Sequence, residues 1–433
     1  MTEKLRIGID FGTSNSSVGS YSEKGPKIYK PTKGALSQPS SIFIRADGFH
    51  TTGVEAVENF TSEKEKKDTY HFIPSIKPGL PLPHYEGIVL KSKSRDTEGN
   101  FITKFFSVEE LASYVISNLK SVAETQSGRM LEEVVMGRPV FFSENQEEDK
   151  LAEGRLKEAA SLSGFKSVHF IMEPIAAALY YERSRHNTSA KNVFIFDFGG
   201  GTLDACLLQL DPSLKISDKS LKSKVLSSYG ITLGGNDLDK DIFSGKYLSY
   251  FGKDVKWGEK KLPMPSHIFN DIAEWHLIEQ LSKYEISSFL RQVSINGTDT
   301  NAIQRLITLI QDQQVFAVLQ SIEQGKIGLS SSPESRIKHD FKNIKIDDPF
   351  TIEEFEYLVA KRRVEIQKCI TECLTRAQLK PDLVDAVLKV GGSSQNIFVD
   401  KILADNFGGK IESDNVFTSV VAGLSIAASE IFD

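Results

Sequence analysis

The stretch "VFIFDFGGGTLDACLLQL" (residues 193–210) is an apolar run interrupted by one acid, three glycines, a threonine and a second acid. Its apolar flanks predict two strands joined by a short turn, which is the pattern of a buried hairpin. The acids are Asp197 and Asp204, and the glycines occupy positions 199–201. A glycine triplet between two carboxyl groups calls for an explanation beyond simple chain reversal.

The same plan occurs near the N-terminus. The segments "RIGIDFGTSNSSVGSY" (6–21) and "NVFIFDFGGGTLDACLL" (192–208) share an apolar strand, Asp, an aromatic residue, Gly, a small polar turn and a second strand. Asp10 aligns with Asp197 in this comparison. The repetition predicts that the chain contains two related halves.

The composition of the two turns predicts a phosphate site. Glycine lets the backbone approach a ligand closely, and successive N–H groups in such a turn form an anion-binding concavity. Carboxylates would repel phosphate there unless a divalent cation lay between them. Because Mg²⁺ prefers one or two carboxylates, waters and phosphate oxygens, Asp10, Asp197 and Asp204 predict a hydrated Mg²⁺ that bridges to polyphosphate. The alternative is a pair of tight hairpin turns with Asx-type hydrogen bonds, and the second matching loop weighs against it.

The overall composition predicts a folded, soluble protein. The 433 residues predict at least two domains, and 40% hydrophobic with 25% charged residues is ordinary for such a chain. A net charge of −6 gives no bias towards nucleic acid or anionic membranes, so neither partner is expected. The N-terminus enters a strand at once and no apolar stretch approaches a membrane span, so we expect a cytoplasmic location.

Three cysteines are too few and too scattered for a disulfide framework. Cys369 and Cys373 are one helical turn apart, which leaves a metal pair as an alternative, but no histidine lies nearby. We expect these two residues and Cys206 to be small buried side chains.

Each half predicts alternating strands and helices. Residues 107–124 read as a helix with Ser107 as N-cap and Glu110 closing a capping box. The turn-rich residues 37–104 interrupt the first half. The rest of the first half predicts a strand at 134–141, a helix at 147–162, a strand at 167–173 and a helix at 174–183. The second half predicts a helix from Asn236, helical patterns at 268–291 and 301–327, one helix at 351–374, a strand at 386–390 and a final helix at 418–432. A glycine turn follows the strand at 386–390, and a serine in it is expected to cap the next helix.

Six motifs occur in the order found in one known family. They are "IGIDFGTSNSSVG", "MEPIAAALYY", "FDFGGGTLDA", "LGGNDLD", "EQGKIGLSSS" and "KVGGSS". The chain therefore resembles the nucleotide-binding (ATPase) domain of the DnaK-type heat shock protein 70 family, within the actin and hexokinase superfamily. Its likeness is greatest to short YegD-type heat-shock-like proteins, which share the G-R-P motif (137–139) and a long second insertion. The match runs from about residue 5 to 430, with looser stretches at 37–104, 240–315 and 333–380.

The resemblance implies an α/β fold of two ribonuclease-H-like (actin-like ATPase) lobes with a central nucleotide cleft. Lobe I would span residues 1–187 with an insertion at about 37–104, and lobe II would span 188–433 with an insertion at about 235–355. The family's peptide-binding domain and helical lid are not expected in this chain. Binding through the 240–315 insertion stays open, although core packing is the favoured interpretation of its aromatic residues.

The resemblance also implies ATP or ADP and Mg²⁺ as ligands. The residues expected to hold the nucleotide are Gly12, Thr13, Ser14 and Asn15 in the first turn, Gly199, Gly200, Gly201 and Thr202 in the second, Gly234 and Gly235, Glu323, Lys326 and Ser330 at the adenosine, and Gly391, Gly392, Ser393 and Gln395. The catalytic residues it implies are Asp10, Lys77, Glu173, Asp197, Thr202 and Asp204, of which Asp10 and Asp197 would hold Mg²⁺ mostly through water.

Two features of this assignment depart from the family pattern. Lys77 is the candidate for the lysine that orients the attacking water, but its surroundings match poorly, and an ordinary surface lysine is an equal alternative. Ile327 and Gln395 replace two arginines that flank the adenine in the family. Because arginine stacking on a base contributes on the order of 1 kcal/mol, we predict adenine binding weaker by about tenfold.

The leading functional hypothesis is Mg²⁺-dependent ATP binding with slow hydrolysis by a chaperone-like domain. A nucleotide-gated interaction module without turnover is the first alternative, because the same acids would serve it. An actin-like filament protein and a sugar kinase are further alternatives that the motif spellings disfavour. The expected partners are the nucleotide and a protein client or co-chaperone.

Overall fold

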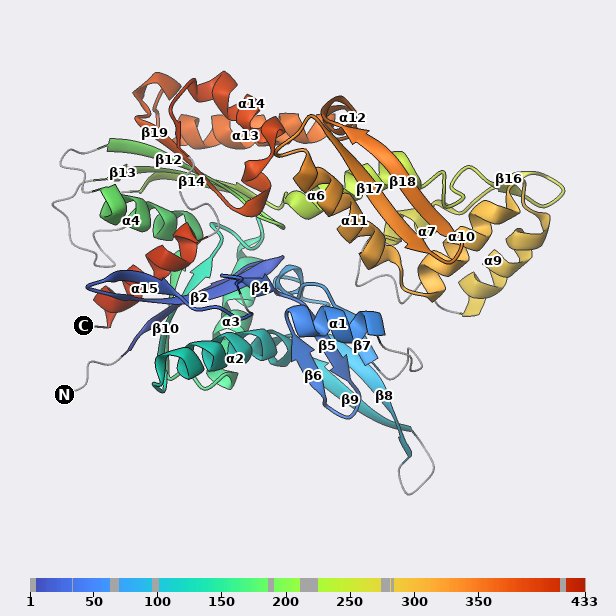
Figure 1. Ribbon diagram of the computed structural model, residues 1–433, viewed down its shortest axis with the longest axis horizontal. Helices are drawn as coiled ribbons and strands as arrows, with labels where there is room; N and C mark the ends of the chain where they lie inside the picture. Colours follow the sequence, from blue (N-terminus) through green and yellow to red (C-terminus); the bar gives the residue numbers. More distant parts are fainter. Residues whose placement is uncertain are drawn as a thin grey trace. The chain divides into compact units, whose positions relative to one another are not determined.

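The computed structural model describes residues 5–32, 34–62, 70–95, 101–185, 191–210, 225–273, 281, 284–412 and 418–432. These residues form a mixed α/β fold, which confirms the α/β part of the prediction. The chain divides into two compact units made of discontinuous segments (Figure 1). The first unit comprises Met1–Gly234, Ile366–Ser394 and Leu403–Asp433, and the second comprises Gly235–Glu365 and Gln395–Ile402.

The first unit contains a six-stranded sheet built around the N-terminal hairpin. Its strand order is β11-β10-β1-β2-β3, and β4 pairs with β2. β1 and β2 are antiparallel, whereas β10 and β11 extend the sheet in parallel with β1. The strands are β1 (Ile7–Phe11), β2 (Asn15–Ser22), β3 (Gly25–Ile28), β4 (Gln38–Pro39), β10 (Glu133–Arg138) and β11 (Ser167–Met172). Asp10 pairs with Ser17, which places it next to the hairpin turn.

A five-stranded sheet in the same unit is built around the glycine-triplet hairpin. Its order is β14-β13-β12-β19-β20. The strands are β12 (Lys191–Phe198), β13 (Leu203–Leu210), β14 (Val225–Ile231), β19 (Ala386–Val390) and β20 (Ile411–Glu412). β12 and β13 are antiparallel, and Asp197 lies directly opposite Asp204. β19 runs parallel to β12 and β20 runs parallel to β19.

The two sheets have the same strand plan. In each sheet the first three strands along the chain form an antiparallel meander. Two later strands then extend the sheet beyond the first strand of that meander, and both run parallel to it. The predicted repeat of an acidic strand-turn-strand unit is therefore confirmed at the level of topology. Asp10 and Asp197 are each the last residue but one of a mostly buried strand, so both lie next to the turn that follows.

Two helices share a core with both sheets. α4 (Glu173–Arg185) and α15 (Ser419–Ile431) lie next to one another (Figure 1), and their buried faces join side chains of β10, β12, β13 and β19 in one cluster. Their backbones are in close contact, as a Cβ added at Gly423 would lie only 1.7 Å from the Ala176 carbonyl oxygen. The small residues of the final helix are thus required by backbone packing.

The helices α2 (Val108–Ser127) and α3 (Gln146–Leu162) pack on each other beside the first sheet. The predicted capping box is confirmed: Ser107 Oγ accepts from the Glu110 amide at 3.2 Å, and a Glu110 carboxylate oxygen accepts from the Ser107 amide at 2.9 Å. Asn145 caps the N-terminus of α3, and its side chain accepts hydrogen bonds from two amides of the first turn.

The turn-rich residues 37–104 build small elements of their own. β5 (Ile42–Arg45) lies between β6 (His50–Thr52) and β7 (Tyr70–Ile73) in a three-stranded sheet covered by α1 (Val54–Ser62). A single 3₁₀ turn, η2 (Lys77–Gly79), follows, and then the hairpin of β8 (Gly87–Arg95) and β9 (Phe101–Ser107) leads into α2.

The second unit is mainly helical with a long hairpin. Its elements are α6 (Gly235–Ile242), the π-helical η3 (Phe243–Tyr247), the short strands β15 (Lys256–Trp257) and β16 (Leu262–Pro263), α7 (Ser266–Asp271), α9 (Tyr284–Asn296), α10 (Thr300–Gln311), α11 (Val315–Gly328), β17 (Glu334–Phe341), β18 (Ile344–Thr351) and α12 (Ile352–Leu358). The Trp257 ring packs edge-on against Phe289 at 5.0 Å, in agreement with core packing. Trp275 lies outside the described residues.

Two local predictions are wrong. The single helix expected at 351–374 is α12 followed by α13 (Ala360–Arg376), because the fully buried Val359 leaves the α-helical region at φ −102° and tertiary packing overrides the helical pattern. The predicted serine cap after β19 is also wrong. Asn396 caps α14 (Ile397–Phe407) by accepting from the Phe398 amide at 2.9 Å, and the preceding serines, in the 3₁₀ turn η5 (Gly392–Gln395), bond elsewhere.

The cysteines are buried, as expected. Cys206 lies in β13, and Cys369 and Cys373 lie on the face of α13 that packs on the second sheet, where Cys373 Sγ donates to the Ala205 carbonyl oxygen. None of the helices in the described part of the chain has both the length and the apolar character needed to cross a membrane.

Candidate functional site

The two hairpin turns of the first unit are in contact. A Cβ added at Gly201 would lie 2.7 Å from Thr13 Oγ1, so the second turn presses its backbone onto the side chain of the first. Only glycine permits this approach without displacement of one turn. The repeated motif therefore folds into two turns that face one another at one place.

The first turn is braced from outside the hairpin. Ser40 Oγ donates to the Gly12 carbonyl oxygen at 2.7 Å, and the Ser40 amide donates to the Ser14 carbonyl oxygen at 2.9 Å. Thr13 is buried, whereas Asn15, at the start of β2, is exposed. The backbone of residues 12–14 is thus held in place while the side chain of Asn15 stays accessible.

The second turn is braced by the loop that follows β19. Gly199 donates to the Thr202 carbonyl oxygen at 3.1 Å, which closes the turn, and Ser393 Oγ donates to the Gly199 carbonyl oxygen at 2.9 Å. Gly391 has φ +80°, and a Cβ there would lie 2.5 Å from the Phe198 carbonyl oxygen and 2.9 Å from Asp197 Oδ1. Gly391 must therefore be glycine for the loop to sit on the end of β12.

Two further predicted glycines lie at the start of α6. Gly234 lies against the second turn, because its added Cβ would meet the Gly200 carbonyl oxygen at 2.1 Å. Gly235 begins α6 in the second unit, and Gly392 is exposed in η5. In the first unit the structure thus brings together the predicted residues of both turns, Gly234 and the loop after β19.

Four carboxyl groups gather behind the turns with one lysine. They are Asp10 of β1, Glu173 at the start of α4, Asp197 of β12 and Asp204 of β13, and the lysine is Lys77. Lys77 Nζ lies 2.8 Å from a Glu173 carboxylate oxygen, and both side chains are largely buried. Lys77 is only 6% exposed, which excludes the surface-lysine alternative.

Burial and mutual repulsion favour protonation of these carboxyl groups. Burial, reinforced by Glu173, raises the pKa of Asp10 to about 7 against the attraction of Lys77. Burial and Glu173 also raise the pKa of Asp204 to about 7, although hydrogen bonds from the Val140 amide and Thr202 side chain oppose the rise. Burial, followed by the three neighbouring carboxylates, raises the pKa of Asp197.

The pKa of Lys77 also rises, but for a lysine a raised pKa favours the charged form. Burial alone would lower the pKa of its ammonium group, but Glu173, Asp10 and Asp204 outweigh burial and raise it. The group is therefore a permanent cation. One ammonium cannot offset four ionised carboxyl groups, which is why protonation is favoured, and a bound divalent cation would supply the missing positive charge.

The donor set fits a magnesium ion held mostly through water. Among the described residues, no group of three or more His, Cys, Asp or Glu side chains is arranged to ligate a metal ion directly. Mg²⁺ commonly binds one or two carboxylates and keeps several waters. Asp10 and Asp197, one from each hairpin, match that requirement, and the glycine-containing backbone of the two turns lies beside them.

The residues predicted to contact adenosine belong to the second unit. Glu323 and Lys326 lie on α11, Ser330 follows that helix, and Gln395 ends η5. Ile327 is 52% exposed on α11, and the buried Gln395 Nε2 has no hydrogen-bond partner among the described residues. The two positions predicted to flank adenine are therefore occupied by an apolar side chain and an amide donor.

The amine of Lys326 is already engaged within the second unit. It donates to the Gly235 carbonyl oxygen at 2.9 Å and to Asp239 Oδ2 at 2.8 Å, which joins α11 to α6. Burial raises the pKa of Asp239 to about 6, although Lys326 acts to lower it. Sequence reasoning missed Asp239, although it stands within the quoted motif "LGGNDLD".

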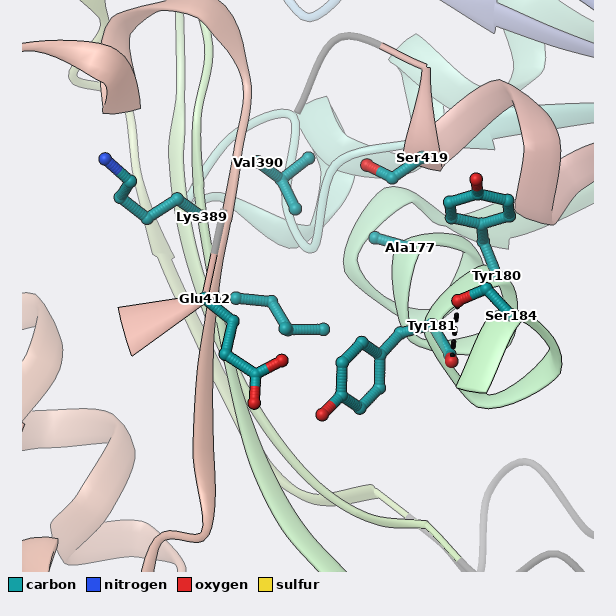
Figure 2. Close-up of a pocket in the computed structure, with 9 residues that line it drawn as sticks. Ala177, Tyr180, Tyr181, Ser184, Lys389, Val390, Glu412 and Ser419 are labelled. Atoms are coloured by element: carbon teal, nitrogen blue, oxygen red, sulfur yellow. Dashed lines mark hydrogen bonds between the residues drawn. The ribbon is translucent and has the colours of Figure 1, made fainter. Parts of the chain in front are cut away.

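A small, mainly apolar pocket lies elsewhere in the first unit (Figure 2). α4 contributes Tyr180 and Tyr181, β20 contributes Glu412, and α15 contributes Ser419. Figure 2 shows the Lys389 side chain directed away from the two tyrosines. None of the predicted site residues lines this pocket, so it adds nothing to the assignment.

The sequence is also similar to a known family model. The model, described as Hsp70 protein, matches residues 6–308, which is well over half of the chain. The matched range includes both acidic hairpins, Lys77 and Glu173. The motif-based resemblance and the family match therefore agree.

Proposed function

The chain belongs to the Hsp70 family, whose domains bind ATP and ADP and act in chaperone-like roles, and on this premise we propose that it is a slow, Mg²⁺-dependent ATPase. The observation that supports this most strongly is the contact of the two acidic hairpin turns, Thr13 against Gly201, beside four buried carboxyl groups. In this proposal the two turns belong to two actin-like lobes, residues 1–187 and 188–433.

Backbone amides of the two turns would bind the β- and γ-phosphates. Residues 12–15 would do so from the first turn and residues 199–202 from the second, with residues 391–393 near the α-phosphate and ribose. Asp10 and Asp197 would hold Mg²⁺ through water. When bound, the ion would neutralise phosphate charge and so lower the barrier to attack by water.

Lys77 and the carboxyl groups would position the water. Lys77 Nζ is charged and is held by Glu173. In the proposal it would hold the attacking water oxygen near the γ-phosphate. Asp204, with a pKa of about 7, is matched to accept the proton that water loses. The new P–O bond forms to water as the bond to the β-phosphate oxygen breaks, which gives ADP, phosphate and a proton.

Adenosine would contact the second-unit residues Glu323, Ser330 and Gln395. Because Lys326 Nζ already binds Asp239 and Gly235, we propose that Lys326 holds α11 against α6 and so supports the residues that contact adenosine. With Ile327 and Gln395 in place of arginines, we propose ATP affinity about tenfold below that of a double-arginine site. A protein client or co-chaperone would respond to the nucleotide state.

Single-turnover hydrolysis of γ-labelled ATP tests the proposal. The parent should release labelled phosphate slowly, and Asp197→Ala should reduce the rate by about 100-fold or more, because it removes a charge that organises the site. Thermal protection by ATP should be measured on the same samples. Protection of the parent without phosphate release would reject the ATPase and favour the nucleotide-gated interaction module.

A further inference from the structure

A buried arginine contacts the loop that carries Lys77. Arg155 projects from the buried face of α3 and is only 9% exposed. Its Nη1 lies within hydrogen-bond distance of three backbone oxygens, those of Gly79 (3.3 Å), Leu80 (3.0 Å) and Leu82 (3.0 Å). A guanidinium group removed from water is costly unless it is hydrogen-bonded, so this arrangement concentrates its interactions on one short segment.

That segment has little regular structure of its own. Lys77 begins the 3₁₀ turn η2, and the Leu80 amide donates to the Lys77 carbonyl oxygen at 3.1 Å. Single turns then follow, because the Leu82 amide donates to Gly79 and the Tyr85 amide to Leu82. No ladder or continuous helix fixes the loop. The Gly79 and Leu82 carbonyl oxygens accept these backbone amides, and Arg155 adds a side-chain donor that joins them to the Leu80 carbonyl oxygen.

Arg155 is itself held by a second helix. Its Nε lies 3.4 Å from a carboxylate oxygen of Glu109, which stands in the first turn of α2. The positions of α2 and α3 are fixed by their mutual packing and by the capping box at Ser107. A continuous set of contacts thus runs from Glu109 through Arg155 and the loop to Lys77 and Glu173.

We propose that Arg155, supported by Glu109, is a positioning residue that fixes the Lys77 loop and thereby places Lys77 Nζ at the carboxyl cluster. The catalytic consequence rests on the proposed ATPase function, whereas the structural consequence does not. A displacement of about 1 Å in a group that orients a reactant can cost about 100-fold in rate. Arg155 therefore acts on turnover without a contact to the nucleotide.

The structural consequence is tested on the nucleotide-free protein. Arg155→Gln is compared with Lys157→Gln, which changes an exposed residue of the same helix. Acetylation of Lys77 by acetic anhydride, followed by mass spectrometry, should be at least fivefold faster in R155Q, and amide exchange of residues 77–82 should rise about tenfold. K157Q should match the parent. If Lys77 acetylation and loop exchange in R155Q equal those of K157Q, the proposal is wrong.

The catalytic consequence is tested by kinetics. R155Q should lower kcat for ATP at least tenfold with less than a twofold change in KM, and Arg155→Lys should restore part of the loss. The kcat of Glu109→Gln should lie between those of the parent and R155Q. If R155Q does not fold, the kcat of Glu109→Gln provides the same test. A parent without hydrolysis would reject the ATPase but leave the acetylation result to decide the positioning claim. Unchanged kcat in R155Q with a mobile loop would reject the catalytic consequence alone.

Discussion

At the scale of single residues, the central feature is Lys77, a buried cation 2.8 Å from a Glu173 oxygen. Its amine is the permanently charged group of the acidic cluster, so hydrolysis should depend on it more than ATP binding does. We expect Lys77→Met to slow γ-phosphate release in a single turnover by about 100-fold, with ATP affinity within threefold of the parent.

The matched control is Lys166→Met, which removes an exposed lysine that also pairs with a glutamate, Glu132. This variant should hydrolyse ATP at the parent rate. Equal rates for K77M and K166M would show that Lys77 has no part in turnover.

Asp239 gives a prediction for pH. Because burial raises its pKa in the folded protein from 3.8 to about 6, the folded state binds a proton more tightly than the unfolded state over that range. Its contribution to stability is therefore fully present below pH 4 and is lost as pH rises through about 6. A shift of this size corresponds to about 1–3 kcal/mol.

Urea unfolding at pH 4.5 and pH 7 measures this contribution. Between these values the parent should lose about 1 kcal/mol or more relative to Asp239→Asn, which cannot titrate. The exposed Asp382→Asn should follow the parent. Identical pH dependence for D239N and the parent would contradict the assigned pKa direction.

At the scale of elements, the acidic hairpins could be predicted from the sequence, whereas the helix break at Val359, the cap at Asn396 and the contacts of Arg155 could not. An apolar run that ends in Asp and glycine carries its own signal, and so does the capping box at Ser107. The break at Val359 and the cap at Asn396 depend on tertiary packing, which no local pattern records. Arg155 carries no motif, since its partners are backbone oxygens more than seventy residues away.

The α4–α15 contact gives a stability prediction. Gly423→Ala would place a Cβ 1.7 Å from the Ala176 oxygen, so the helices must separate. We expect a loss of about 1–3 kcal/mol in the free energy of unfolding, measured by urea denaturation.

Gly154→Ala on α3 is the matched control, because its Cβ would meet no atom within 4 Å. It should stabilise the protein by up to about 1 kcal/mol through helix propensity alone. If G423A were as stable as G154A, the close packing of α4 and α15 would be wrong.

At the scale of the whole molecule, the residues that the motifs predict for nucleotide binding belong partly to one compact unit and partly to the other. The sequence predicted them through motifs, whereas the boundaries of the units follow from packing that motifs do not report. A ligand that binds only the folded chain stabilises it by about 2.7 kcal/mol at a concentration of 100 times Kd. We therefore expect Mg²⁺ and ATP together to raise Tm by several degrees.

The most direct test of the account is isothermal titration calorimetry with ATP in magnesium buffer and again in EDTA. If a metal-bridged triphosphate is bound by the two acidic turns, ATP should give a saturable heat with magnesium, and its affinity should fall at least tenfold in EDTA. The absence of any binding heat in magnesium for adenine and guanine nucleotides alike, or equal affinity in both buffers, would contradict the account.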